Sequence, residues 1–376
     1  MRLAFLAALV GFVCTAQFSI PIKKSGAAPK FRKSQQLKKG NQVLYDTLDE
    51  YYLATVTLGT PAQTFNVAVD TTSSNFWVLD VNCASRNCHG FVHDNTLKHT
   101  YNSSASSTFR DSKKDFEIEY HESPVSGKLG QEKLNMAGFT ISNQDFGRAV
   151  NVPYVYTKQP VDGVLGLGFP AHAISGTKPV IVKLLPHLDS PVFSIWLDKH
   201  GEDYMDAGGA IVYGGVDKQK CDGEVNYASL ANFTVWGYYV DGVSFGIYER
   251  VGKQQAISTT GSGWTGMPSR DFTALVNITK ATYDLANEAF MVPCSNIKSY
   301  PDIILLIAGK PYTIKSENYV IDLGLHNGQC ALAFYDTNDE SGEMPWVIGD
   351  ALIRGYCHIY DFGLARIGFA KFIRNG

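Results

Sequence analysis

The chain has little net charge and, after its first residues, no long apolar run. Its 33 lysines and arginines nearly balance 36 aspartates and glutamates, which gives a formal net charge of -3 over 376 residues. Such a chain offers no basic face for a phosphate backbone, so we expect no nucleic-acid partner. The later apolar run at 303–308 is far shorter than the ~20 residues of a membrane-spanning helix. We expect no membrane partner, and we predict a buried strand at this run.

Side-chain combinations that bind metals are also missing. The chain has only seven cysteines, and no histidine lies beside them at the spacing of a zinc site. We therefore predict no metal and no cofactor. The composition, 45% hydrophobic and 18% charged, is that of an ordinary soluble protein large enough for two substantial cores.

The first residues have the pattern of a secretory signal. Arg2 supplies the positive charge, residues 3–13 the apolar stretch and residues 14–16 a small-residue cleavage site. We predict a signal peptide over 1–16 and a secreted, extracellular protein. Three N-glycosylation sequons fit secretion, and they begin at Asn102, Asn232 and Asn277.

Six cysteines remain once Cys14 leaves with the signal, an even number in an oxidising compartment, so we predict three disulfides. Cys83 and Cys88 can close a small loop, and spacing alone assigns only this pair. The pairing that completes the set joins Cys294 to Cys330 and Cys221 to Cys357.

A basic segment follows the signal. Residues 17–44 contain several lysines and few apolar side chains. The segment resembles a short propeptide, and a solvated, disordered N-terminal arm is the alternative.

Short alternating segments separated by turn residues dominate from residue 45 onward. Examples are 52–58 and 64–69, bounded by turns such as Gly59, Thr60 and Pro61. This pattern predicts a mostly β protein. Helices are expected at 270–281 and, more briefly, at 180–185.

The chain contains an internal repeat. Residues 69–74 read VDTTSS and align with STTGSG at 258–263, each at the end of an apolar strand. Further on, GVLGLG at 163–168 corresponds to PWVIGD at 345–350. Two similar lobes facing each other across a cleft would account for the repeat. We place an N-terminal β lobe at 45–217 and a C-terminal β lobe at 218–376.

Residues 70–78 read DTTSSNFWV and resemble the first active-site loop of pepsin-like aspartic proteases. That loop has the pattern Asp-Thr-Gly-Ser-Ser-Asn, an apolar residue and Trp-Val. Other motifs follow in the family's order, including DGVLGL at 162–167, FSIWL at 193–197 and VIGD at 347–350. The resemblance covers the chain from about residue 45 and implies a bilobal fold of two pseudo-twofold-related β-barrel lobes with a cleft between them.

The family's catalytic pair is incomplete in this chain. Family members use two aspartates that share one proton, one to deprotonate a water and the other to hydrogen-bond the scissile carbonyl. Asp70 fills the first position, but Thr259 stands in the second, according to both the repeat and the family pattern. Threonine cannot ionise. The resemblance therefore implies a catalytically inactive, pseudoprotease member, with Thr71 and Thr260 interlocking the two loops by hydrogen bonds.

The resemblance also assigns substrate-binding positions. Thr72 replaces the glycine of the first loop, where a β-branched side chain adds bulk beside the substrate. Gly261 keeps the corresponding glycine of the second loop. Tyr120 stands at the tyrosine of the flap hairpin that closes the cleft, and Trp77 is its expected partner.

Three functions compete. The leading prediction is a monomeric, non-catalytic protein that binds a peptide or an apolar ligand in the cleft. The first alternative is an acid endopeptidase with weak residual activity that uses Asp70 alone. The second is an interaction or storage protein that does not use its cleft.

Overall fold

The computed structural model describes most of the chain after the basic segment. The described residues are 39–47, 51–90, 97–119, 124–157, 159–174, 176–199, 204–337 and 345–374. The predicted signal peptide at 1–16, most of the segment at 17–44 and the predicted flap residue Tyr120 lie outside them.

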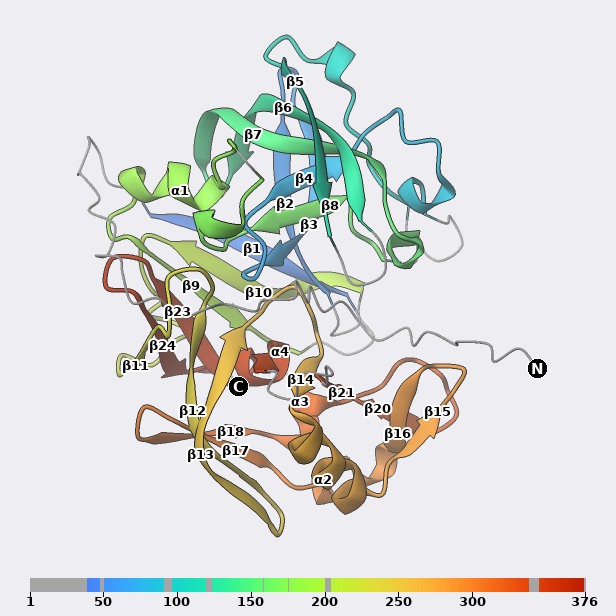
Figure 1. Ribbon diagram of the computed structural model, residues 1–376, viewed down its shortest axis with the longest axis vertical. Coiled ribbons are helices and arrows are strands. Elements are labelled where there is room, and N and C mark those ends of the chain that lie inside the picture. Colours follow the sequence, from blue (N-terminus) through green and yellow to red (C-terminus); the bar gives the residue numbers. More distant parts are fainter. Residues whose placement is uncertain are drawn as a thin grey trace.

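The protein is mostly β, as the sequence predicts. Figure 1 shows one group of strands at the top of the molecule, a second at the bottom, and β1, β9, β10, β23 and β24 between them. Within the described residues a 13-stranded sheet contains, in spatial order, β11 (Asn226–Ser229), β24 (Arg366–Lys371), β23 (Tyr356–Asp361), β9 (Val192–Leu197), β10 (Tyr204–Tyr213), β1 (Gly40–Thr47), β2 (Tyr51–Leu58), β3 (Gln63–Asp70), β8 (Gly163–Gly166), β4 (Phe76–Leu79), β7 (Phe139–Asn151), β6 (Val125–Met136) and β5 (Arg110–Ile118).

The remaining described strands form two smaller sheets in the lower half of Figure 1. The 7-stranded sheet contains β18 (Lys310–Ile314), β17 (Ile303–Ile307), β12 (Gly237–Phe245), β13 (Tyr248–Ser258), β22 (Trp346–Ile348), β14 (Thr265–Met267) and β21 (Phe334–Asp336). The 4-stranded sheet contains β15 (Thr282–Asp284), β16 (Ala289–Pro293), β20 (Gln329–Leu332) and β19 (Val320–Ile321).

Helices are short and few in the part of the chain that the structure describes. The α-helices are α1 (Val180–Leu184), α2 (Ser269–Thr279), α3 (Ser316–Tyr319) and α4 (Asp350–Ile353). The 3-10 turns are η1 (Arg86–Cys88), η2 (Ser103–Ala105), η3 (Tyr154–Thr157), η4 (Pro170–His172), η5 (Leu185–His187) and η6 (Cys294–Ser299). Both predicted helices are present, because α2 and α1 fall on 270–281 and 180–185. None of these helices is long and apolar enough to cross a membrane.

The strand predicted as buried at 303–308 is only half buried. β17 alternates, with Ile303, Leu305 and Ile307 fully buried but Ile304 and Leu306 about two-fifths exposed, at 40% and 38%. The predicted strand is present, but its burial is limited to one face, because it belongs to an antiparallel arrangement with only one covered face.

The internal repeat corresponds to a repeated strand arrangement. β8 lies between β3 and β4, parallel to the first and antiparallel to the second. β22 lies between β13 and β14 in the same way, parallel to β13 and antiparallel to β14. The ends of β3 and β13 carry the two loops that the sequence aligns, so the fold presents these loops in equivalent settings.

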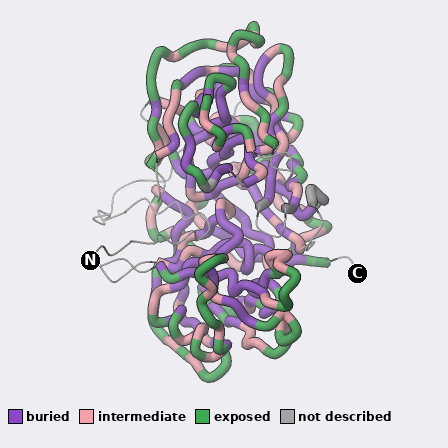
Figure 2. The backbone as a smooth tube through the Cα atoms, turned by 90° about the vertical axis from the view of Figure 1, so that its right-hand side faces the viewer, coloured by how far each residue is buried: buried purple, intermediate pink, exposed green. Residues whose placement is uncertain are grey.

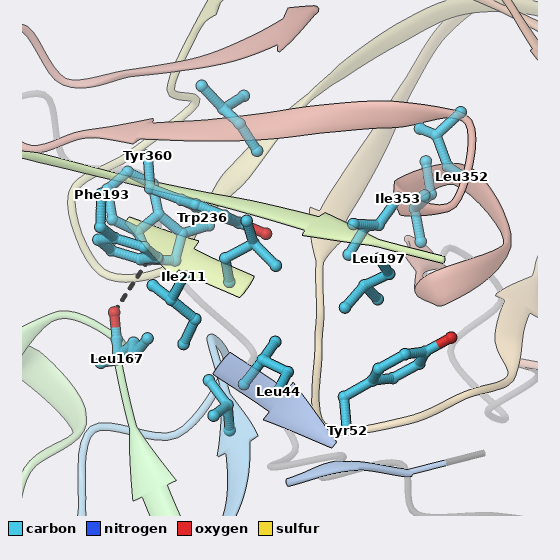
Figure 3. Close-up of a cluster of buried hydrophobic side chains, with 14 of the residues drawn as sticks. Leu44, Tyr52, Leu167, Phe193, Leu197, Ile211, Trp236, Leu352, Ile353 and Tyr360 are labelled. Atoms are coloured by element: carbon cyan, nitrogen blue, oxygen red, sulfur yellow. Dashed lines mark hydrogen bonds between the residues drawn. The ribbon is translucent and has the colours of Figure 1, made fainter. Parts of the chain in front are cut away.

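A shared apolar core joins the upper and lower groups of strands. Figure 3 shows Leu44 of β1 packed near Ile211 of β10, with Phe193, Trp236 and Tyr360 close by. The Trp236 indole donates a hydrogen bond to the Leu167 carbonyl at 3.2 Å. Figure 2 shows buried backbone running continuously through the middle of the molecule. β1 begins at Gly40, so part of the segment predicted as propeptide-like belongs to this central sheet.

All three predicted disulfides are present. Cys83 pairs with Cys88, Cys221 with Cys357, and Cys294 with Cys330. The last two tie segments that are 136 and 36 residues apart, and such cross-links stabilise a fold largely by restricting its unfolded chain.

Candidate active site

The two aligned loops meet through a set of reciprocal hydrogen bonds. The Thr71 backbone N–H donates to Thr260 Oγ1 at 3.2 Å, and Thr260 Oγ1 donates to the Val69 carbonyl at 2.9 Å. In the other direction, Thr71 Oγ1 donates to the Ser258 carbonyl at 3.0 Å. The threonines predicted to interlock the loops therefore lie in bonds that cross from one half of the repeat to the other.

Asp70 ends β3 directly beside this crossing and is buried, with 6% of its surface exposed. Its Oδ1 accepts two hydrogen bonds from Thr72, one from the backbone N–H at 2.7 Å and one from the hydroxyl at 2.5 Å. Burial raises the pKa of the Asp70 carboxyl, and the hydrogen bonds from Thr72 and Ser73 partly offset that rise. No charged group contributes to this shift among the described residues.

Thr259 follows β13 and is also buried, with 3% of its surface exposed. The Gly261 backbone N–H donates to Thr259 Oγ1 at 3.1 Å. This is the bond that Thr72 N–H makes to Asp70 in the first loop, from residue i+2 to the side chain of residue i. The two loops thus have the same local bonding, with a carboxylate in one and a hydroxyl in the other.

Gly261 lies against the Asp70 carboxyl group. A Cβ added at position 261 would come within 2.6 Å of Asp70 Cγ, 2.8 Å of Oδ1 and 2.9 Å of Oδ2. Only a residue without a side chain fits there, so the second loop closes over the first at this glycine. Asp70 is consequently in close contact with both Thr72 of its own loop and Gly261 of the second loop.

The other predicted substrate-binding residues are placed in part. Trp77 of β4 is fully buried and packs edge-on against Tyr156, with ring centroids 5.3 Å apart. Its expected partner Tyr120 lies outside the described residues. Thr72 is half-buried. Of the predicted glycosylation sites, Asn102 and Asn277 are exposed and Asn232 is half-buried.

A buried polar cluster beneath the crossing was not predicted. Ser258 Oγ lies 3.0 Å from His358 Nδ1 and 2.9 Å from Tyr360 OH, and the same serine's carbonyl accepts the bond from Thr71. His358 is fully buried, and its Nε2 has no hydrogen-bond partner among the described residues. Burial lowers the pKa of His358 to about 3. No motif marks these residues, because β23 brings His358 to Ser258 from 100 positions away.

Asp271 cannot act as a replacement acid. This residue lies on α2, and its side chain is fully buried. Its carboxylate accepts a 2.7 Å hydrogen bond from Tyr248 OH and pairs with Arg250 at 2.9 Å. Both partners belong to β13, so Asp271 links α2 to that strand and is a structural group of the C-terminal half.

Replacing Arg250 should destabilise the protein through Asp271. In Arg250→Met the buried carboxylate keeps its charge and loses its ion pair, which we expect to cost about 2–3 kcal/mol in the free energy of unfolding. Chemical denaturation at neutral pH measures the change. The double variant Arg250→Met/Asp271→Asn removes the uncompensated charge and should recover part of the loss. If the double variant is as unstable as the sum of the two single variants, the pair is not coupled as described.

Metal-binding side chains gather at one place in the described part of the chain. Cys294, Asp322 and Cys330 bring one ligand atom each within 4.8 Å of one another. The two cysteines form a disulfide with each other, so neither can supply the thiolate that a metal would need.

Comparison with known proteins agrees with the loop motifs and the fold. Residues 51–372 match the family model described as "Eukaryotic aspartyl protease". "Aspartic protease 1" of Caenorhabditis elegans is 38% identical over 347 residues, which are 92% of this chain and 88% of that protein. "Aspartic protease 17" of the same organism is 37% identical and aligns over 99% of both chains. Human "Gastricsin" is 30% identical over 86% of this chain and 82% of its own length.

Proposed function

Because the chain belongs to the eukaryotic aspartyl protease family, we propose that it is a secreted, catalytically inactive member that binds a peptide or an apolar ligand between its lobes. The observation that carries the proposal is the side chain at position 259. Thr259 occupies the place in the second loop that Asp70 occupies in the first, and it has the same hydrogen bond from residue i+2.

With a hydroxyl at position 259, the site lacks the second carboxyl group that could bind or release a proton. Two adjacent carboxyl groups raise each other's proton affinity, so that one stays protonated while the other is ionised. Among the described residues Asp70 has no such neighbour, and burial is the main cause that raises its pKa. Above that pKa the site carries one charge and no acidic proton. Losing a general acid or base costs on the order of 10²- to 10⁴-fold in rate.

The parts of the site that serve structure are retained. The reciprocal bonds of Thr71 and Thr260 hold the loops together, and Gly261 still closes against Asp70. Retention of this framework without the second acid supports a binding role over a cutting one. We propose that the ligand binds at the family's usual location, in the cleft between the lobes.

Secretion is supported by the N-terminal pattern at 1–16 and by the three disulfides. On the same grounds we propose an extracellular location, where the sequons at Asn102, Asn232 and Asn277 become glycosylation sites.

Residual proteolysis is the second candidate function, because Asp70 is retained with its hydrogen bonds. A single carboxylate can still orient and polarise a water. This candidate predicts slow cleavage at acid pH that depends on Asp70.

Native mass spectrometry tests the binding proposal. The secreted protein is incubated with a peptide mixture from a digested protein, separated from free peptides and measured intact. We expect retained peptides at stoichiometric amounts and with unchanged masses, and weaker retention in the isosteric variant Asp70→Asn. Absence of any retained ligand would contradict a binding role. Shortened peptides that accumulate with time would contradict catalytic inactivity instead.

A further inference from the structure

Thr72 departs from the family pattern in the first loop and directly contacts the one acid that remains. The sequence suggests only that its bulk obstructs the substrate. The hydrogen bonds give the residue a second role, because both of its donors, the backbone N–H and the hydroxyl, meet Asp70 Oδ1, at 2.7 and 2.5 Å. A glycine at this position would supply only the first of them.

We propose that Thr72 is a positioning residue that holds Asp70 as a fixed hydrogen-bond acceptor, its hydroxyl taking the place of the proton that a second carboxyl group would have shared. The inference rests on the proposed loss of the catalytic pair and adds a consequence to it. The two threonines then have related roles. Thr259 replaces the second acid, and Thr72 donates hydrogen bonds to Asp70, the acid that is left.

Burial makes such a partner necessary. Only 6% of the surface of Asp70 is exposed. A buried carboxylate without hydrogen bonds is strongly disfavoured. Gly261 also packs closely against the carboxyl group and has no side chain to donate a hydrogen bond. The Thr72 hydroxyl is therefore the one side-chain donor to Asp70 among the described residues, and hydrogen bonds to an ionised acceptor are the strong ones.

The arrangement also defines which ligand group the site can meet. Oδ1 already accepts two bonds from Thr72, and Gly261 lies close to both oxygens of the carboxyl group. An ionised Asp70 can only accept, so it matches a ligand that donates a hydrogen bond, such as an amide N–H, a hydroxyl or an ammonium group. A catalytic pair differs, since its protonated member donates to a carbonyl oxygen.

A titration of Asp70 tests the role of Thr72. The full chain is labelled with ¹³C at the aspartate side-chain carboxyl carbons, and its NMR signals are followed from pH 2 to 8. The signal of Asp70 is assigned as the one that disappears in Asp70→Asn. Thr72→Val keeps the shape of the side chain without the hydroxyl, and Thr72→Ser keeps the hydroxyl without the methyl group.

We expect Asp70 to bind its proton about tenfold more tightly in Thr72→Val than in the unmodified protein. Thr72→Ser should titrate like the unmodified protein. If Val and Ser titrate alike, the hydroxyl does not hold Asp70 and the inference is wrong. Should Thr72→Val fail to fold, Thr72→Gly makes the same comparison with the family's own residue.

The same samples separate this inference from the proposed function. Each is assayed for cleavage of a denatured protein. A proteolytic unmodified chain would overturn the proposed function, whereas the titration of Asp70 decides the role of Thr72 whether or not the chain cleaves.

Discussion

The double variant Thr72→Gly/Thr259→Asp is expected to cleave a denatured protein substrate at acid pH at least about 10²-fold faster than the unmodified chain. Aspartate at 259 restores a second carboxyl group at the position where Gly261 N–H already donates to the side chain. Glycine at 72 removes the hydroxyl that bonds Asp70 and opens the approach to it. Initial cleavage rates between pH 2 and 7 measure the gain.

Two further variants show where the gain comes from. Thr259→Asp alone should give a smaller increase, because the Thr72 hydroxyl still occupies Asp70 Oδ1. Thr72→Gly/Thr259→Asn has the same shape as the double variant but lacks the acid, and it should remain inactive. If the aspartate variant folds with the same thermal midpoint as the asparagine variant and cleaves no faster, the loops do not preserve a catalytic arrangement.

Acid should destabilise this protein through His358. The folded state holds this histidine neutral until about pH 3, whereas an exposed histidine binds a proton near pH 6.5. Between these values the unfolded state binds more protons than the folded state, so stability falls as the pH falls. The loss approaches about 1.4 kcal/mol per pH unit over this window. That is large beside a total stability of about 5–15 kcal/mol.

Denaturant unfolding at a series of pH values between 7 and 3 measures the effect. His358→Gln removes the titrating ring. The slope of its unfolding free energy against pH should therefore be smaller than that of the unmodified protein, by the amount that corresponds to about one bound proton. His187→Gln is the matched control, because His187 is exposed and its replacement should leave the slope unchanged. Equal slopes in the unmodified protein and in His358→Gln would show that His358 is not held neutral by burial.

Much of the fold followed from the sequence because its signals are local. The alternating segments at 52–58 and 64–69 became β2 and β3, and the helix expected at 270–281 became α2. The repeat predicted equivalent settings for two loops, and the strand arrangements around β8 and β22 agree with it. These patterns depend on neighbours within a few residues, which a sequence displays directly.

The rest depends on contacts that the sequence does not display. Asp271 lies in the predicted helix, but its partners Tyr248 and Arg250 belong to β13, and the sequence does not show that this strand meets the helix. His358 meets Ser258 only because β23 passes beneath the crossing of the loops. Thr72 was recognised as unusual from its motif, whereas its bond to Asp70 required the geometry of the loop.

The most direct test of catalytic inactivity compares the unmodified chain with Asp70→Asn. Both proteins, freed of the N-terminal residues that precede β1, are incubated with a denatured protein from pH 2 to 7. The account predicts that the two cleave at the same background rate at every pH, because a lone Asp70 without a second acid does not complete the reaction. Cleavage by the unmodified chain that disappears in Asp70→Asn and is blocked by a transition-state peptide analogue would contradict it.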